Sequence, residues 1–78
     1  MTEGSKKYLY KIHVDSAADL VKLSQAAARC PYDVTLVSGR HRLNAKSLLG
    51  VILAKLSWED IYVETETDCY FELEQFIQ

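Results

Sequence analysis

The sequence lacks the features that mark secreted and membrane-spanning proteins. The opening MTEGSKK has no signal-peptide core, and no apolar run approaches the ~20 residues that cross a bilayer. Two cysteines, Cys30 and Cys69, could pair, but a cytoplasmic chain would normally keep them reduced. We therefore expect a cytoplasmic protein with no membrane partner.

An excess of charge of one sign is also absent. Eleven acidic and nine basic residues give a net charge of −2, and both signs occur through the middle of the chain. This balance argues against a nucleic-acid partner, because such partners are usually bound by a dense basic surface. The 78 residues, 49% of them hydrophobic, suffice for one small core.

The sequence also contains no recognisable arrangement of catalytic or metal-binding residues. The histidines His13 and His41 and the two cysteines have neither CxxC nor HxxxH spacing, so we expect no metal and no cofactor. Cys30 and Cys69 fall on apolar stripes and are expected to be small core residues. Because no nucleophile–base pair or carboxylate pair is evident, we expect no enzyme activity.

Hydrophobic periodicity predicts seven elements in a domain over 8–78, preceded by a flexible tail over 1–7. Strand-like alternation covers 8–14, 32–37, 40–43 and 60–66. Between these segments, Asp15 or Ser16 is placed to cap a helix that Pro31 ends, and Ser47 is placed to open a second one. Leu48, Val51, Ile52 and Lys55-Leu56 fit the spacing of this second helix.

A last helix is expected after Thr67 or Asp68, either of which could cap it, with one stripe made by Cys69, Leu73, Phe76 and Ile77. The order is strand, helix, strand, strand, helix, strand, helix. Short hairpins and right-handed crossovers then favour an α+β open-faced sandwich. Its four-stranded, mainly antiparallel sheet would carry three helices on one face.

With this order of elements, the chain resembles the HPr family of phosphocarrier proteins. The resemblance covers nearly the whole domain and is closest over YDVTLVSGRHRLNAKSLLGVILAKLSWEDIYVET, residues 32–65. In the family, the Ala-Lys-Ser-Leu stretch opens the second helix, and its serine is a regulatory phosphorylation site in many low-GC Gram-positive members. Ser47 matches that serine. The resemblance also implies that the second helix docks to enzymes and regulators through an apolar patch.

The other half of the family signature is missing. Family members carry a phosphoacceptor histidine at the start of the first helix, followed by Thr-Arg-Pro-Ala. Counting back from Ser47 without gaps, the matching positions are Ser16-Ala17-Ala18-Asp19-Leu20. A hydroxyl at Ser16 would form a stable ester instead of a phosphoramidate, and Asp19 would repel a phosphate. We therefore expect no phosphorelay, and we interpret His13 and His41 as ordinary solvated side chains.

Two functions remain. The first is a non-catalytic HPr-like regulatory or adaptor protein that binds a protein partner, such as a regulator or kinase, and is linked to the phosphotransferase system or carbon metabolism through Ser47. The alternative is a small structural or self-associating domain, for example a homodimer, without a phosphotransfer role. Ser47 is either a helix cap alone or also a phosphosite, stabilised by the helix dipole and basic neighbours. The candidate partner-binding residues are Arg40, Arg42, Lys46, Leu48, Leu49 and Ile52.

Overall fold

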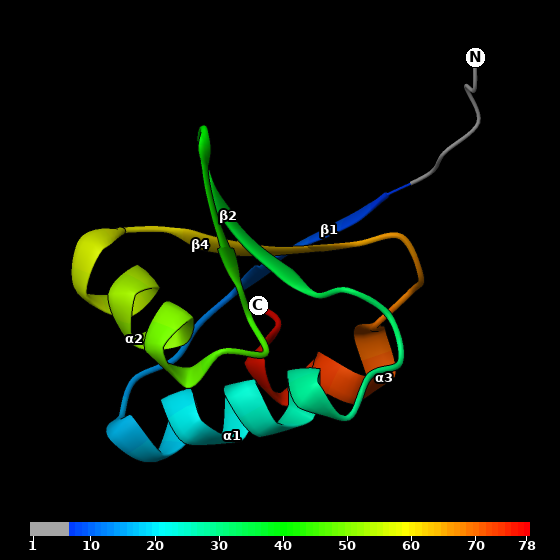
Figure 1. The fold of residues 1–78 in the computed structure, drawn as a ribbon, viewed down its shortest axis with the longest axis horizontal. Helices are drawn as coiled ribbons and strands as arrows, with labels where there is room; N and C mark the ends of the chain where they lie inside the picture. The colour runs from blue at the N-terminus through cyan, green and yellow to red at the C-terminus, as the bar shows by residue number, and fades with distance from the viewer. Residues whose placement is uncertain (1–6) are drawn as a thin grey trace.

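Four antiparallel strands form a single open sheet in the order β1-β4-β2-β3, and the helices cover one of its faces (Figure 1). The computed structural model describes residues 7–78, so residues 1–6 of the predicted tail lie outside the described part. This confirms the predicted α+β fold and its βαββαβα order. The elements are β1 (Tyr8–Ile12), α1 (Ala17–Ala28), β2 (Thr35–Ser38), β3 (His41–Asn44), α2 (Leu48–Ser57), β4 (Ile61–Thr65), α3 (Tyr70–Leu73) and the 3-10 turn η1 (Glu74–Phe76).

Alternation along the strands decides which side chains meet the helices. Val63 of the inner strand β4 pairs with Tyr10 on one side and Leu36 on the other, and this row faces the core. The neighbouring row, which contains Glu64 and Thr35, faces away from the helices. The two faces of the sheet therefore follow the period-two alternation along the strands.

Helix α1 packs closely because its inward face is made of small residues. Leu23, Ala26 and Ala27 are buried, and Cys30 continues the same stripe beyond the helix. Leu20, Leu23, Ala27 and Cys30 recur at helical spacing, and all but the partly buried Leu20 are buried. Both cysteines are free and buried, as expected of small core residues.

Helix α2 buries the face that carries its small residues. Its inward residues are Gly50, Val51 and Ala54, whereas Leu48 and Leu56 are 41% and 79% exposed. The predicted helix is therefore present, but of the residues that fit its spacing only Val51 is buried and Ile52 partly buried. Small residues let the helix backbone approach its neighbours, so size and not hydrophobicity selects the buried face.

The C-terminal segment is also less regular than predicted. Helix α3 is a single turn, and Cys69 occupies its N-cap position without a side-chain capping bond. Asp68 nevertheless accepts a hydrogen bond from the Tyr70 N–H at 3.0 Å, so one of the two expected capping residues does bind the first turn. Ile77 lies beyond η1 and forms a bridge with Ile12.

The end of the chain runs beside β1. The His13 N–H donates to the Phe76 carbonyl at 2.8 Å, and the Gln78 N–H donates to the Lys11 carbonyl at 3.0 Å. Along the residues that the structure describes, no helix has the length and apolar character needed to cross a membrane.

Gly50→Ala is expected to destabilise the protein although alanine favours helices. A Cβ at Gly50 would lie 2.7 Å from the Asn44 carbonyl oxygen, which is backbone and cannot move aside cheaply. We expect a net loss of about 1–3 kcal/mol, the usual cost of overpacking. Urea unfolding followed by circular dichroism measures it. A gain of about 1 kcal/mol, as at an exposed helical glycine, would contradict this packing.

Candidate functional site

Ser47 is the N-cap residue of α2. Its backbone is extended, and its Oγ accepts a hydrogen bond from the Gly50 N–H at 3.2 Å. The turn before it is held by Asn44, whose Oδ1 accepts from the Lys46 N–H at 2.9 Å and whose carbonyl accepts from the Ser47 N–H at 3.2 Å. The predicted capping role of Ser47 is therefore confirmed.

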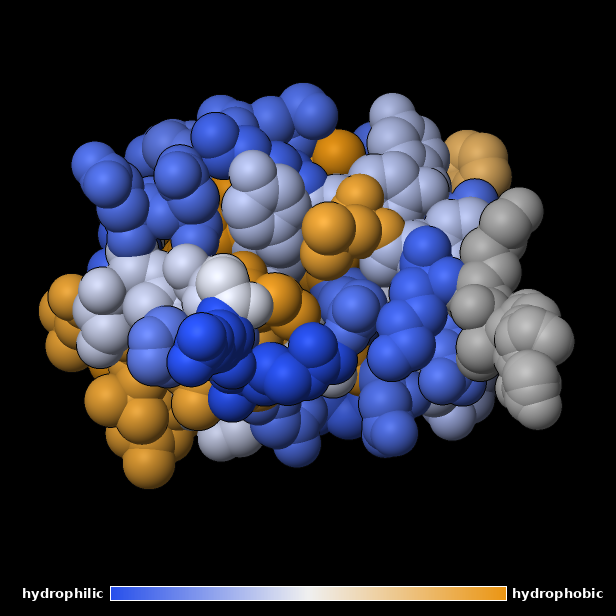
Figure 2. Space-filling view, turned by 90° about the horizontal axis from the view of Figure 1, so that it is seen from above, coloured by the Kyte–Doolittle hydropathy of each residue, from blue (hydrophilic) through white to orange (hydrophobic). Residues whose placement is uncertain are grey.

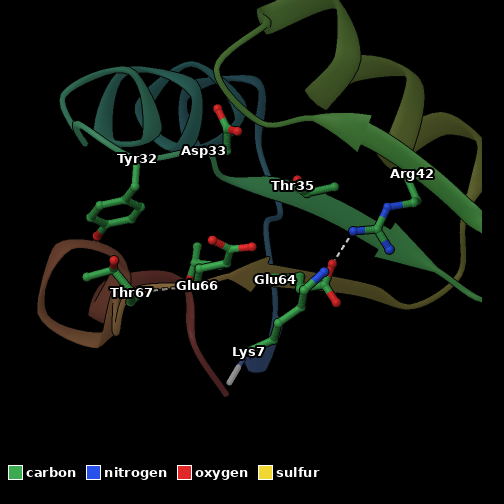
Figure 3. A pocket seen from close by; sticks show the side chains of 9 residues that line it. Lys7, Tyr32, Asp33, Thr35, Arg42, Glu64, Glu66 and Thr67 are labelled. Atoms are coloured by element: carbon green, nitrogen blue, oxygen red, sulfur yellow. Dashed lines mark hydrogen bonds and ion pairs between the residues drawn. The ribbon is translucent and has the colours of Figure 1, made fainter. Parts of the chain in front are cut away.

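The basic residues near Ser47 in the sequence are separated in space. Lys46 Nζ donates to the Cys30 carbonyl at 2.9 Å, which directs the side chain toward the end of α1. Arg42 forms an ion pair with Glu64 on the uncovered face of the sheet, on the side away from the helices (Figure 3). Arg40 is exposed in the turn between β2 and β3. The three cations therefore do not form one cluster around Ser47.

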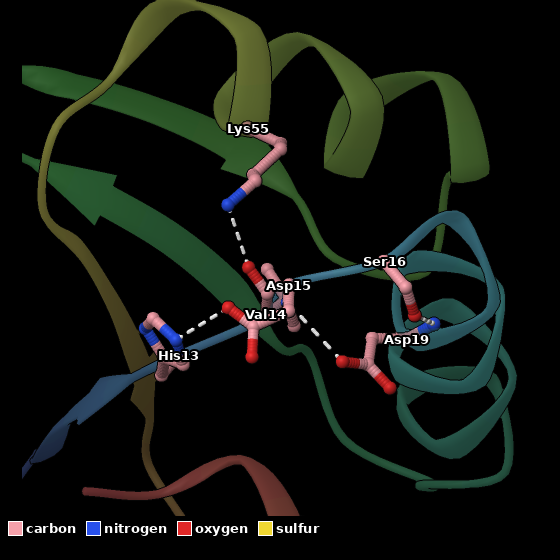
Figure 4. Close-up of polar contacts among 6 residues, drawn as sticks. All are labelled: His13, Val14, Asp15, Ser16, Asp19 and Lys55. Atoms are coloured by element: carbon pink, nitrogen blue, oxygen red, sulfur yellow. Dashed lines mark hydrogen bonds and ion pairs between the residues drawn. The ribbon is translucent and has the colours of Figure 1, made fainter.

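The start of α1 has a different electrostatic character (Figure 4). Ser16 is its N-cap and accepts from the Asp19 N–H at 3.2 Å, while Asp19 Oδ2 accepts from the Asp15 N–H at 3.1 Å. That backbone hydrogen bond from Asp15 lowers the pKa of the Asp19 carboxyl below its ordinary value. Ser16 therefore has carboxylates before and after it, and Asp19 remains ionised at neutral pH.

Neither histidine is placed like a phosphoacceptor. His13 lies just beyond β1, not within the strand as the alternation suggested, and its Nε2 is 2.6 Å from Asp15 Oδ1. His41 begins β3, and its ring stacks on Trp58 with a centroid distance of 6.2 Å. Each imidazole thus already has a side-chain partner, a carboxylate for His13 and an indole ring for His41.

Four leucines of α2 form an exposed stripe that we call the leucine face: Leu48, Leu49, Leu53 and Leu56. Their exposed fractions are 41%, 66%, 44% and 79%, and Ile52 between them is partly buried. Seen from above the sheet, hydrophobic side chains gather at the end of the molecule where α2 lies (lower left in Figure 2). A contiguous apolar stripe of this kind is typical of an interaction surface.

Two members of the leucine face, Leu53 and Leu56, were not among the predicted partner-binding residues. The spacing 49-53-56 follows one side of a helix and was the available signal. This signal did not give a unique answer, because five leucine and isoleucine residues in a ten-residue helix are compatible with several different apolar stripes. Of the predicted set, Leu48 and Leu49 belong to the face, Ile52 lies at its buried edge, and Arg42 points elsewhere.

Acidic and basic residues are unevenly distributed along the chain, although the net charge is only −2. Residues 40–57 contain four basic residues and no acidic one, whereas residues 64–78 contain five acidic residues and no basic one. The β2–β3 hairpin and α2 lie at the same end of the molecule, and β3 contacts α2 (Figure 1). The leucine face nevertheless has charges of both signs near it, because Lys46 precedes α2 and Glu59 and Asp60 directly follow it.

A shallow groove of about 290 Å³ lies where the uncovered face of the sheet meets the loop before β2 (Figure 3). Its charges alternate in sign, because Lys7 and Arg42 lie among Asp33, Glu64 and Glu66. Arg42 is the only predicted site residue in it. Among residues 7–78, no group of three or more histidine, cysteine or acidic side chains is arranged to hold a metal ion.

No family model, curated protein or solved structure matches the chain. The features of the molecule that bear on function are therefore the two helix caps, the leucine face and the distribution of charge.

Substitutions at Ser47 test the cap. Ser47→Ala is expected to lower the free energy of unfolding by about 1 kcal/mol, because the Gly50 N–H loses its acceptor. Ser47→Asp should be nearly as stable as wild type, since aspartate is also a good N-cap. Urea denaturation of both variants measures the difference, with Ser57→Ala at the other end of α2 as the control. Equal stability of all three variants would show that the hydroxyl contributes nothing.

Proposed function

We propose that the protein is a non-catalytic, HPr-like regulatory or adaptor protein that binds a protein partner through the leucine face. The observation that carries this proposal is the exposure of four leucines on a helix opened by Ser47. In the family that the sequence resembles, the corresponding helix docks to enzymes and regulators. In this chain, too, the serine caps the helix that carries the apolar stripe.

The chemistry of the leucine face indicates the kind of partner. Helix α2 contains one basic residue and no acidic one, and Lys46 lies directly before Ser47. A partner surface with apolar residues and with carboxylates at the Ser47 end would complement it, since Glu59 and Asp60 follow the other end of α2. A ten-residue helix is only about 15 Å long, so the contact is small, as in transient signalling complexes.

Phosphate carriage is not part of the proposed function. At the position that matches the family histidine, the Ser16 hydroxyl already accepts a hydrogen bond from the Asp19 backbone. The carboxylates of Asp15 and Asp19 would also repel an approaching phosphoryl group. The proposed role of the protein is therefore docking to a partner and does not include phosphate transfer.

Ser47 is the proposed point of regulation. A phosphate on its Oγ would lie at the N-terminus of α2, where the helix dipole stabilises negative charge. It would also add ~1.5–2 negative charges beside Leu48, at the border of the leucine face. Phosphorylation should therefore weaken binding of an acidic partner, and this is how a link to sugar transport or carbon metabolism would operate.

The protein is expected to accept no phosphoryl group from the general enzyme of the phosphotransferase system. Incubation with that enzyme and labelled phosphoenolpyruvate should leave the chain unlabelled, while an authentic HPr in the same tube becomes labelled. Acid-labile label on His13 or His41 would contradict the proposal.

Leu49→Asp is expected to abolish partner binding without unfolding the protein, because Leu49 is 66% exposed. A matched control is Leu9→Asp on the uncovered face of the sheet, where the leucine is 57% exposed. Proteins retained from cell extract by wild type and by Leu9→Asp, but not by Leu49→Asp, would be purified and titrated by calorimetry. We expect at least a tenfold loss of affinity, about 1.4 kcal/mol, for a central leucine.

Wild-type affinity should fall as salt rises, because the rim of the interface is charged. Equal binding of Leu49→Asp and wild type would refute the leucine face as the docking surface. Loss of the folded circular dichroism spectrum in Leu49→Asp would show instead that this side chain belongs to the core.

A further inference from the structure

A group of exposed aromatic side chains lies at helix α3, at the end of the molecule away from α2 (Figure 1). Tyr10, Tyr70 and Phe71 form a chain of contacting rings, which we call the aromatic face, with centroid distances of 5.9 Å and 5.7 Å. Phe71 is 84% exposed and Tyr70 is 37% exposed. The ring planes meet at 58° and 83°, so the rings form a corner and not a flat stack.

A carboxylate is fixed beside these rings. Asp68 accepts hydrogen bonds from the Tyr10 hydroxyl at 2.9 Å and from the Tyr70 N–H at 3.0 Å. The hydrogen bond to Asp68 raises the pKa of Tyr10 to about 12, so the proton stays on the hydroxyl at neutral pH. Both donors are therefore neutral, and Asp68 keeps its negative charge.

The other carboxylates of this end are not neutralised either. Glu72 accepts a hydrogen bond from the neutral Tyr32 hydroxyl at 3.4 Å, and Glu74 is exposed three residues after the phenylalanine. Among residues 7–78, no basic side chain forms an ion pair with Asp68, Glu72 or Glu74. Even if Arg29 at the end of the adjacent helix α1 is counted, the three carboxylates leave an excess of negative charge.

We propose that the aromatic face binds a basic segment of a partner protein, with an arginine side chain held against Tyr70 and Phe71. A guanidinium group stacks on aromatic rings and pairs with a carboxylate at the same time, and it is less strongly hydrated than an ammonium group. Because Asp68 lies directly beside Tyr70, the rings and the negative charge meet the same cation. A purely apolar partner would leave the three carboxylates without a counter-charge.

The aromatic face lies apart from the leucine face, and its ligand does not depend on what binds there. Helices α2 and α3 both contact α1 and stand on either side of it beneath the sheet (Figure 1). Two partners can therefore be bound at the same time, one at each end of the molecule. The aromatic face thus adds a second contact to the proposed adaptor role.

A fluorescein-labelled hexapeptide of alternating glycine and arginine is the probe for this site. Its fluorescence anisotropy should rise to saturation when it is titrated with the protein in about 50 mM sodium chloride. Raising the salt to about 500 mM should weaken binding at least severalfold, because salt screens the attraction. The same peptide with lysine in place of arginine should bind more weakly, since an ammonium group lacks the planar stacking surface of arginine.

Two variants separate the contribution of the ring from that of the charge. Phe71→Leu keeps an exposed apolar side chain without the ring, and Asp68→Asn keeps an acceptor for the Tyr10 hydroxyl without the charge. Each should raise the dissociation constant of the arginine peptide about two- to fivefold, the usual size of an exposed cation–π contact or surface ion pair. Leu56→Ser and Glu59→Gln, at exposed positions at the other end, should bind like wild type. Circular dichroism checks that every variant is folded.

The proposal is overturned if wild type does not bind the arginine peptide or if Phe71→Leu binds it as tightly as Leu56→Ser does. Equal affinity for the lysine peptide would also overturn it, because the site would then be a general acidic surface. Self-association of wild type in sedimentation equilibrium that Phe71→Leu abolishes would show that a second copy occupies the face instead. The proposed function is tested separately, because Leu49→Asp should still bind the arginine peptide and Phe71→Leu should still bind the partner captured by the leucine face.

Discussion

The arrangement of this protein depends on how closely the first turn of α2 approaches the end of β3. The Asn44 carbonyl oxygen lies 2.7 Å from the position that a Cβ of residue 50 would occupy, which is too close for any residue but glycine. This contact fixes the rotation of α2 about its own axis, so that Val51 and Ala54 face the core. With α2 in this orientation, the leucines on its opposite side remain exposed to solvent. Ser47, which caps the helix, lies next to them in the sequence.

Local features of the sequence predicted much of this structure, and contacts between distant residues account for what they missed. Strand alternation and helix caps depend on a few neighbouring residues, so the strands and the Ser47 cap could be identified from the sequence, and the cap of α1 could be narrowed to Asp15 or Ser16. The buried face of α2 depends on the distant Asn44 backbone, and apolar residues on every side of the helix gave no unique answer. The partner of Arg42 comes from β4, 22 residues away, which sequence proximity to Ser47 could not indicate.

The two capped helices show how one residue type can have different consequences in different electrostatic surroundings. Ser16 and Ser47 each accept a backbone hydrogen bond from the residue three positions later, at 3.2 Å in both cases. Around Ser16, Asp15 and Asp19 provide negative charge, and Asp19 binds back to the chain. Around Ser47, the chain from 40 to 57 contains no acidic residue. An anion is therefore disfavoured at the first helix and tolerated at the second, although the capping geometry is the same.

The hydrogen bonds between the C-terminal residues and β1 have a consequence for solubility. β1 is an edge strand, and the outer edge of such a strand can pair with a strand of another molecule. Residues 76–78 occupy part of that edge through the His13 and Gln78 amides and the Ile12–Ile77 bridge. The opposite edge is β3, which is four residues long and carries Arg42. One edge is thus partly covered by the chain itself and the other is short and charged, which leaves little template for uncontrolled β-sheet aggregation.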